Sequence, residues 1–146
     1  MTRLAEKIIQ YLKKFEMFSD LDDDCLFQIA SRGKPKIVNA GETIIQEGEN
    51  DLNFYIILNG TVQVWATEFA TGEKKLINTL SSGSIIGEMA IVAKEPRSAS
   101  VLAIDKALLM WYDNATIQQL LNDYPIFQKK IRRIGGEHFS QNLFLT

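Results

Sequence analysis

The chain has 146 residues, of which 46% are hydrophobic and 23% charged, and its formal net charge is −2. This length suits one domain with a substantial core, so we expect a single domain over residues 1–146. The slight negative charge argues against nucleic acid as a partner, because sequence-independent DNA affinity comes from clustered lysines and arginines.

Cysteine usage and hydropathy bear on the compartment. Cys25 is the only cysteine, so no disulfide forms within the chain and a reducing compartment is expected. No apolar run approaches the ~20 residues that a membrane-spanning helix needs, and the first residues lack the hydrophobic segment of a signal peptide. We expect a cytoplasmic protein with no membrane partner.

The first predicted region, residues 1–34, consists of helices. An amphipathic helix opens the chain, with apolar residues at helical spacing: Leu4, Ile8, Ile9 and Leu12. Asp22 is a suitable N-cap for a second helix. The side chains expected to face inward from this second helix are Leu26, Ile29 and Ala30.

The middle region, residues 35–112, alternates short apolar runs with glycine-marked turns, which predicts strands. We expect eight of them, at residues 36–38, 43–45, 54–58, 61–66, 73–80, 84–86, 98–104 and 108–112. Asn59-Gly60 predicts a hairpin, because a type I′ turn needs positive φ at both central residues. The expected fold class is mainly β with flanking helices: an eight-stranded, jelly-roll-like β-roll with N-terminal helices and a C-terminal lid helix.

The last region, residues 113–146, is again helical. Asp113 or Asn114 caps a helix that stops before Pro125, and Pro125 lies in the first turn of a final helix. Gly135-Gly136 predicts a bend there. The final helix carries an apolar stripe of Phe127, Ile131, Ile134 and Phe139. This stripe has two uses that the sequence leaves open, namely packing on the chain's own roll or forming a homodimer.

Residues 83–101 (GSIIGEMAIVAKEPRSASV) hold the most informative pattern. Glycines let the backbone approach a ligand, and a helix that opens after them directs free amides outward to bind an anion. Here those amides belong to Met89 and Ala90. Arg97 follows Glu88 by nine positions and can supply a bidentate positive fork. Donors for a phosphate and an acceptor for a hydroxyl predict a receptor for a sugar phosphate.

Enzymatic chemistry finds little support in this sequence. A metal-dependent jelly-roll enzyme usually needs several histidines, and His138 is the only one. The same shortage argues against serine or cysteine nucleophiles, and no GxxxxGK[ST] phosphate loop occurs. We expect no catalytic residue, no metal and no cofactor apart from a bound ligand.

The pattern at residues 83–101 resembles the phosphate-binding cassette of the cyclic nucleotide-binding domain family. That family includes the catabolite activator protein, the regulatory subunit of protein kinase A and cyclic-nucleotide-gated channels. Three further segments are similar to its signatures, at residues 40–48 (AGETIIQEG), 54–60 (FYIILNG) and 120–125 (LLNDYP). The resemblance covers nearly the whole chain, from about residue 15 to about residue 143.

The resemblance implies roles for the cassette residues. Glu88, beside Gly87, would accept a hydrogen bond from the ribose 2′-hydroxyl, since a carboxylate only accepts. Arg97 would bind the exocyclic phosphate oxygens, helped by the amides of Met89 and Ala90. Ser98 would add a phosphate contact, and as a serine it matches the catabolite activator pattern, which favours cAMP over cGMP.

The resemblance also implies a base site. Val64, Ile77 and Ile86 would lie against the purine, although each is also an ordinary candidate for the core of the roll. Asn142 falls where the catabolite activator protein contacts adenine from its last helix, and an asparagine amide can pair with adenine. A solvent-exposed Asn142 is the alternative.

The function that follows is a non-catalytic sensor of cAMP or cGMP. It would transmit a conformational change to an output domain, either covalently linked or separate. Two alternatives remain at this point. One is a structural or interaction domain of the same fold without ligand, and the other is the effector domain of a transcription factor that lacks its DNA-binding module.

Overall fold

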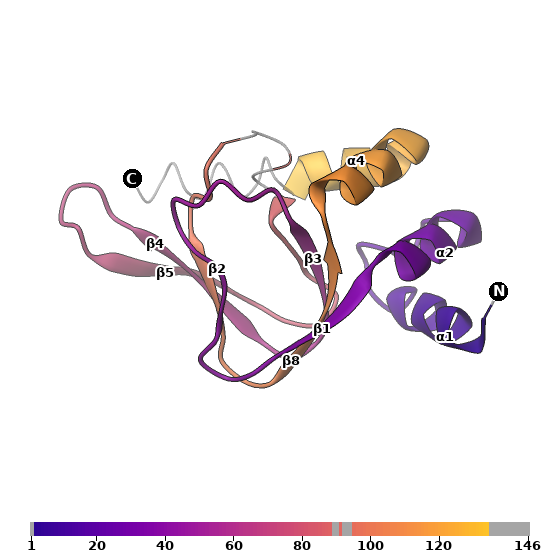
Figure 1. The fold of residues 1–146 in the computed structure, drawn as a ribbon, viewed down its shortest axis with the longest axis horizontal. Coiled ribbons are helices and arrows are strands. Elements are labelled where there is room, and N and C mark those ends of the chain that lie inside the picture. Colours follow the sequence, from indigo (N-terminus) through magenta and orange to yellow (C-terminus); the bar gives the residue numbers. More distant parts are fainter. Residues whose placement is uncertain (1, 89–90, 92–94, 135–146) are drawn as a thin grey trace.

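A computed structural model describes residues 2–88, 91 and 95–134 of the chain. Figure 1 shows a body of strands with helices gathered at one end, and a long hairpin that projects from the other end. This is the expected β-roll with flanking helices. That residues 1–146 form one domain stays a prediction.

The N-terminal region forms two helices, α1 (Arg3–Leu12) and α2 (Asp23–Arg32). Asp22 caps α2 as expected, with its side chain accepting from the backbone N–H of Cys25 at 2.8 Å. All three residues expected to face inward from α2 are buried. The amphipathic helix is present as predicted, but Leu4 is 68% exposed and Ala5 takes the buried position one turn before Ile9.

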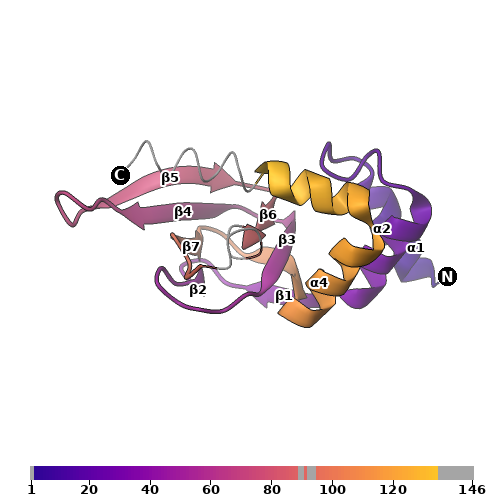
Figure 2. The same cartoon turned by 90° about the horizontal axis from the view of Figure 1, so that it is seen from above.

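The roll consists of two four-stranded antiparallel sheets. Its strands are β1 (Lys34–Val38), β2 (Thr43–Ile45), β3 (Phe54–Asn59), β4 (Val62–Thr67), β5 (Lys74–Leu80), β6 (Ile85–Ile86), β7 (Ser100–Ala103) and β8 (Ala107–Tyr112). The order is β1-β8-β3-β6 in one sheet and β2-β7-β4-β5 in the other. Figure 2 shows β4 and β5 side by side along the length of the second sheet. All eight expected strands are present.

The hairpin predicted at Asn59-Gly60 was wrong. The strands on either side of it, β3 and β4, belong to different sheets and do not pair. Gly60 has φ +107°, and a Cβ built on it would come within 2.6 Å of the Cβ of Ala107. The positive φ and the absence of a side chain at Gly60 therefore allow the chain to pass from one sheet to the other in close contact with Ala107. The long hairpin joins β4 to β5 instead.

The first residues of two strands, β1 and β7, differ from expectation by two positions, and each difference has a physical reason. β1 begins at Lys34 and includes Pro35, which an edge strand tolerates because the missing N–H breaks no ladder bond. β7 begins at Ser100 rather than at residue 98. Arg97 instead bonds through its backbone to the loop between β2 and β3, which delays the pairing of β7.

The helices after the roll complete one side of the core. Asp113 caps α4 (Asn114–Asp123), which ends before Pro125 as predicted, and residues 125–134 form the next helix. Phe127 and Ile131 are fully buried, so these two members of the stripe pack on the chain's own core. Phe139 and Gly135-Gly136 lie outside the described residues.

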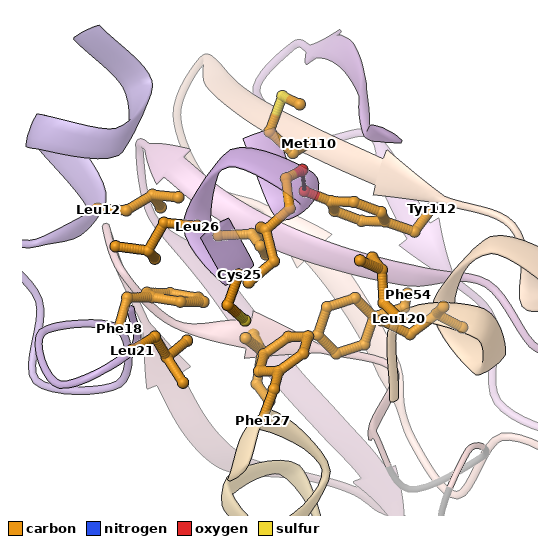
Figure 3. Packing of buried hydrophobic residues seen from close by; sticks show 14 of the residues in the cluster. Leu12, Phe18, Leu21, Cys25, Leu26, Phe54, Met110, Tyr112, Leu120 and Phe127 are labelled. Carbon is orange, nitrogen blue, oxygen red and sulfur yellow. Dashed lines mark hydrogen bonds between the residues drawn. The ribbon is translucent and has the colours of Figure 1, made fainter. Parts of the chain in front are cut away.

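The interior divides into two clusters of buried side chains. One, between the helices and the first sheet, contains Phe18, Leu26, Phe54, Tyr112 and Phe127, and Figure 3 shows these side chains converging. The other lies between the two sheets and is called the roll cluster here. It consists of Val38, Ile45, Tyr55, Ile57, Val62, Ile86, Val101, Ala103, Ala107 and Leu109.

Candidate functional site

The candidate site begins where β6 ends, at Gly87. This residue has φ +94°, a backbone conformation that residues other than glycine rarely adopt. A Cβ here would lie 2.5 Å from the carbonyl oxygen of Asn53 and 3.0 Å from Nη1 of Arg97. Gly87 therefore gives the chain both its turn and the room in which the arginine lies.

Backbone bonds fix Arg97 against the loop that joins β2 to β3. The N–H of Arg97 donates to the carbonyl of Glu49, and the N–H of Gly48 donates to the carbonyl of Arg97, both at 2.8 Å. The arginine is thus held by a segment almost fifty residues earlier in the chain. These two bonds lie outside the strands and hold the segment before β7 against the loop after β2.

The guanidinium of Arg97 is buried and tightly bonded, since its side chain is only 3% exposed. Nε and Nη2 donate to the two carboxylate oxygens of Asp51 at 3.3 and 2.5 Å. Nη2 also donates to the carbonyl of Asn53 at 2.5 Å, and Nη1 to the carbonyl of Gly87 at 3.0 Å. Within the described residues, four of the five N–H groups of the guanidinium are engaged.

Asp51 carries the counter-charge for this arginine. Burial alone would raise the pKa of Asp51, but hydrogen bonds from Arg97 and its positive charge outweigh that effect and hold the pKa below its usual value. Asp51 is therefore ionised at neutral pH, and the pair forms a bidentate fork of the kind that also recognises phosphates.

Glu88 follows Gly87 directly and is buried, with only 3% of the residue exposed. Ser98, the next residue after Arg97, is exposed. The expected cassette amides of Met89 and Ala90, and Asn142 of the expected lid, lie outside the described residues. Whether these residues contact a ligand stays a prediction.

The predicted base-lining residues take different positions. Ile86 is 2% exposed and belongs to the roll cluster, and half-buried Val64 packs against the same cluster. Ile77 is half-buried on β5. The structure therefore brings Val64 and Ile86 to one apolar interior, while Ile77 lies on the edge strand beyond β4.

Two residues of this site were missed by the sequence reading, namely Asp51 and Asn53. They belong to a loop with no motif of its own, and Asp51 is separated from Arg97 by 46 positions. The local sequence gave no signal that could have paired them.

A cavity of about 630 Å³ lies elsewhere, between the segment after α1, the turn before β6 and the helix at residues 125–134. Lys130 is ion-paired with Asp20 on its rim. Those predicted ligand-binding residues that the structure describes do not line this cavity.

Among the described residues, no group of three or more His, Cys, Asp or Glu could hold a metal ion. Among the helices they form, none has the length and apolar character to cross a bilayer.

Comparisons with known proteins agree with this geometry. Residues 35–124 match the family model described as "Cyclic nucleotide-binding domain". A cAMP-dependent protein kinase regulatory subunit from Blastocladiella emersonii is 30% identical over 115 residues, which is 79% of this chain and 28% of that protein. The cyclic nucleotide-gated channel beta-3 of Mus musculus is 32% identical over 125 residues, covering 84% of this chain and 18% of the channel. This chain therefore spans less than a third of either relative.

Among solved structures, one described as "Sp-2Cl-cAMPS bound to PKAR CBD2" superposes with a TM-score of 0.80 at 26% identity. The match covers 97% of this chain and 90% of that one. The family match extends over the whole roll and over the turn and arginine that form the candidate site. The chain belongs to the cyclic nucleotide-binding domain family.

Proposed function

We propose that this chain is a non-catalytic sensor that binds a cyclic purine mononucleotide and passes a conformational change to an output domain or partner. The observation that carries the proposal is the buried Arg97, which is held in a fixed plane beside the Gly87 turn and Glu88. Family membership supports the same reading.

Arg97 is the proposed ligand of the cyclic phosphate. Its fork geometry suits phosphate oxygens as well as it suits the carboxylate that it now binds. Two of the guanidinium N–H groups are bound to the carboxylate of Asp51. A phosphate would bind Arg97 by replacing this carboxylate as the acceptor of those two N–H groups. The amides of Met89 and Ala90 are the proposed additional donors.

Glu88 is the proposed acceptor for the ribose 2′-hydroxyl. A carboxylate that accepts such a bond favours ribose over 2′-deoxyribose, because the deoxy sugar has no 2′-hydroxyl to donate to it. Val64, Ile77 and Ile86 are proposed to contact the base, with Asn142 above it. Ser98 in place of threonine makes cAMP the expected ligand ahead of cGMP.

The proposed switch follows from the bonds of Arg97. In this structure the guanidinium joins the β2–β3 loop to the Gly87 turn. A phosphate that replaces Asp51 on Arg97 would loosen that loop and draw the cassette inward. The chain would then have two arrangements, with Arg97 bound either to Asp51 or to the phosphate, and they would differ in their affinity for the ligand. The signal passed on is limited to this differential affinity.

The output stays a proposal because the curated relatives are several times longer than this chain. A kinase subunit and a channel both contain related domains, so the partner would be a linked or separate output module. Phe127 and Ile131 are buried in the chain's own core, which leaves them no surface for a homodimer. A reducing, cytoplasmic setting stays a proposal that rests on the presence of a single cysteine in the sequence.

The test is isothermal titration calorimetry with cAMP and cGMP on wild type and Arg97→Ala, with Arg32→Ala as the control. Truncating a buried charged partner typically costs about 2–5 kcal/mol, so Arg97→Ala should weaken binding at least about 30-fold. Arg32 pairs with Asp123 on the helices, away from the site, and its removal should leave affinity unchanged.

Arg97→Lys keeps the charge without the fork, and its binding should also fall. Circular dichroism melts of each variant separate loss of binding from loss of fold. Wild-type affinity in a folded Arg97→Ala variant would contradict the proposed phosphate site. The alternative of a domain that has the fold without the ligand predicts no heat with either nucleotide.

A further inference from the structure

The far half of the β4–β5 hairpin, residues 66–75, is supported by a neighbouring strand on one side only. β4 pairs with β7 over residues 62–65, and β7 begins at Ser100, which lies opposite Trp65. Beyond Trp65, β4 pairs with β5 alone among the described strands, and Figure 1 shows this part of the hairpin projecting from the roll. Phe69 at its tip is 89% exposed.

A carboxylate from another loop takes the place of a strand beside this part of β4. The N–H of Glu68 donates to the carbonyl of Glu73 within the hairpin, and successive N–H groups of an extended chain point to opposite sides. The N–H of Thr67 therefore points away from β5, where it donates to Oε1 of Glu47 at 3.2 Å. The hydroxyl of Thr67 donates to Oε2 of Glu47 at 2.8 Å. These two bonds between Glu47 and Thr67 are called the clasp here.

Glu47 belongs to the loop that also holds Arg97. The next residue, Gly48, donates its N–H to the carbonyl of Arg97, and Asp51 binds the guanidinium. The N–H of Glu47 itself donates to the hydroxyl of Ser100, at the start of β7. One short loop thus contacts the candidate phosphate site through Asp51 and the hairpin through the clasp.

The clasp is the tie between the far half of the hairpin and the rest of the chain. Both of its bonds have a carboxylate as acceptor, which makes them stronger than bonds between neutral groups, and both side chains are half-buried. The charges nearer the tip pair within the hairpin instead, Lys75 with Glu68 and with Glu73, each at 3.5 Å. Among the described residues, Glu47 is the side chain outside the hairpin that bonds to residues 66–75.

We propose that the clasp couples the hairpin to the phosphate site, so that binding of a cyclic nucleotide releases the hairpin and shifts its exposed tip. This inference rests on the function proposed above. When a phosphate replaces Asp51 on Arg97, the loop between β2 and β3 loses a bond that fixes it, and Glu47 moves away from Thr67. The hairpin is then held by its own pairing alone, and Phe69 takes a different position relative to an output module.

The first test is nucleotide affinity, because coupling between two sites is reciprocal. If the nucleotide opens the clasp, removal of the clasp should favour the nucleotide. Thr67→Val keeps the side-chain shape without the hydroxyl, and Glu47→Ala removes both bonds. Calorimetric titrations with cAMP and cGMP are made on wild type, on both variants and on the control Thr79→Val, whose side chain is exposed on β5.

Thr67→Val should raise the affinity for the nucleotide about three- to tenfold, which corresponds to the loss of one hydrogen bond from the nucleotide-free arrangement. Glu47→Ala should raise it at least as much. The double variant should bind no more tightly than Glu47→Ala alone, because both changes remove the same contact. Thr79→Val should leave the affinity unchanged.

The second test observes the clasp directly, through hydrogen exchange of single amides measured by NMR. A saturating nucleotide should make the Thr67 amide exchange about tenfold faster or more, because it loses its acceptor on Glu47. The Glu68 amide is bonded within the hairpin to Glu73 and should keep its rate. In Glu47→Ala the Thr67 amide should exchange fast with and without nucleotide.

A wild-type chain that binds nucleotide while the Thr67 amide keeps its exchange rate would overturn the coupling and leave the sensor function intact. Unchanged or lowered affinity in folded Thr67→Val and Glu47→Ala variants would do the same. A wild-type chain that binds neither nucleotide would overturn the sensor function, and the coupling with it. Circular dichroism melts identify a variant that has failed to fold, and the other variant and the wild-type exchange rates then decide.

Discussion

Arg97 and Asp51 form a pair that couples the candidate site to folding. The arginine side chain is 3% exposed and the aspartate side chain 29% exposed, so removal of the carboxylate leaves a buried cation without its counter-charge. Asp51→Asn should lower the free energy of unfolding at neutral pH by about 1–2 kcal/mol, discounted because the aspartate is partly exposed. Urea denaturation measures this change, with Glu49→Gln, exposed in the same loop, as the control.

The same pair predicts a dependence on pH. The pKa of Asp51 is lower in the folded chain than in the unfolded one. Its contribution is therefore fully present above the unfolded value of about 3.9 and is lost as the pH falls through the folded pKa. The difference in free energy of unfolding between wild type and Asp51→Asn should shrink as the pH falls below the unfolded value. A difference that stays constant across this range would show that the carboxylate does not titrate as described.

Gly87 offers a second prediction at the residue scale. Gly87→Ala strains a backbone with φ +94° and places a Cβ 2.5 Å from the carbonyl of Asn53 and 3.0 Å from Arg97. The control is Gly72→Ala, where φ is +71° and nothing lies within 4 Å. Both variants should lose about 1 kcal/mol or more to strain, but only Gly87→Ala should also weaken nucleotide binding. Equal affinities in the two variants would contradict the description of this turn.

The residues of the cassette motif could be predicted from the sequence, whereas the partner of Arg97 could not. Gly87, Glu88 and Arg97 lie within one short pattern whose chemistry points to a phosphate and a hydroxyl. Asp51 lies 46 positions earlier in a loop without a motif, so only the folded chain brings it to Arg97.

At the scale of elements, the side chains on the buried face of the helix at residues 125–134 attach it to the core, and those on its exposed face do not. Phe127 is fully buried and packs against Phe18, with ring centroids 6.4 Å apart, whereas its neighbour Ile126 is 61% exposed. Phe127→Ala should cost about 3–5 kcal/mol, and Ile126→Ala no more than about 0.5 kcal/mol. Urea denaturation compares the two. Similar losses would mean that the helix does not pack as described.

Helix ends and strand positions were predictable because they depend on neighbouring residues. Asp22 and Asp113 cap their helices as their residue type suggests, and the eight strands lie where short apolar runs occur. The partners of those strands were not predictable. Gly60 was interpreted as a hairpin residue, yet it leads the chain from one sheet to the other because its close contact with Ala107 leaves room only for glycine.

For the whole molecule, the proposed sensor function requires that the roll holds a cyclic nucleotide against Arg97. Calorimetric titration of the wild-type chain with cAMP and with cGMP measures this binding directly. We expect saturable heat with one nucleotide bound per chain, and ligand at a hundred times its dissociation constant should raise the free energy of unfolding by about 2.7 kcal/mol. No heat and no change in melting temperature with either nucleotide at millimolar concentration would contradict it.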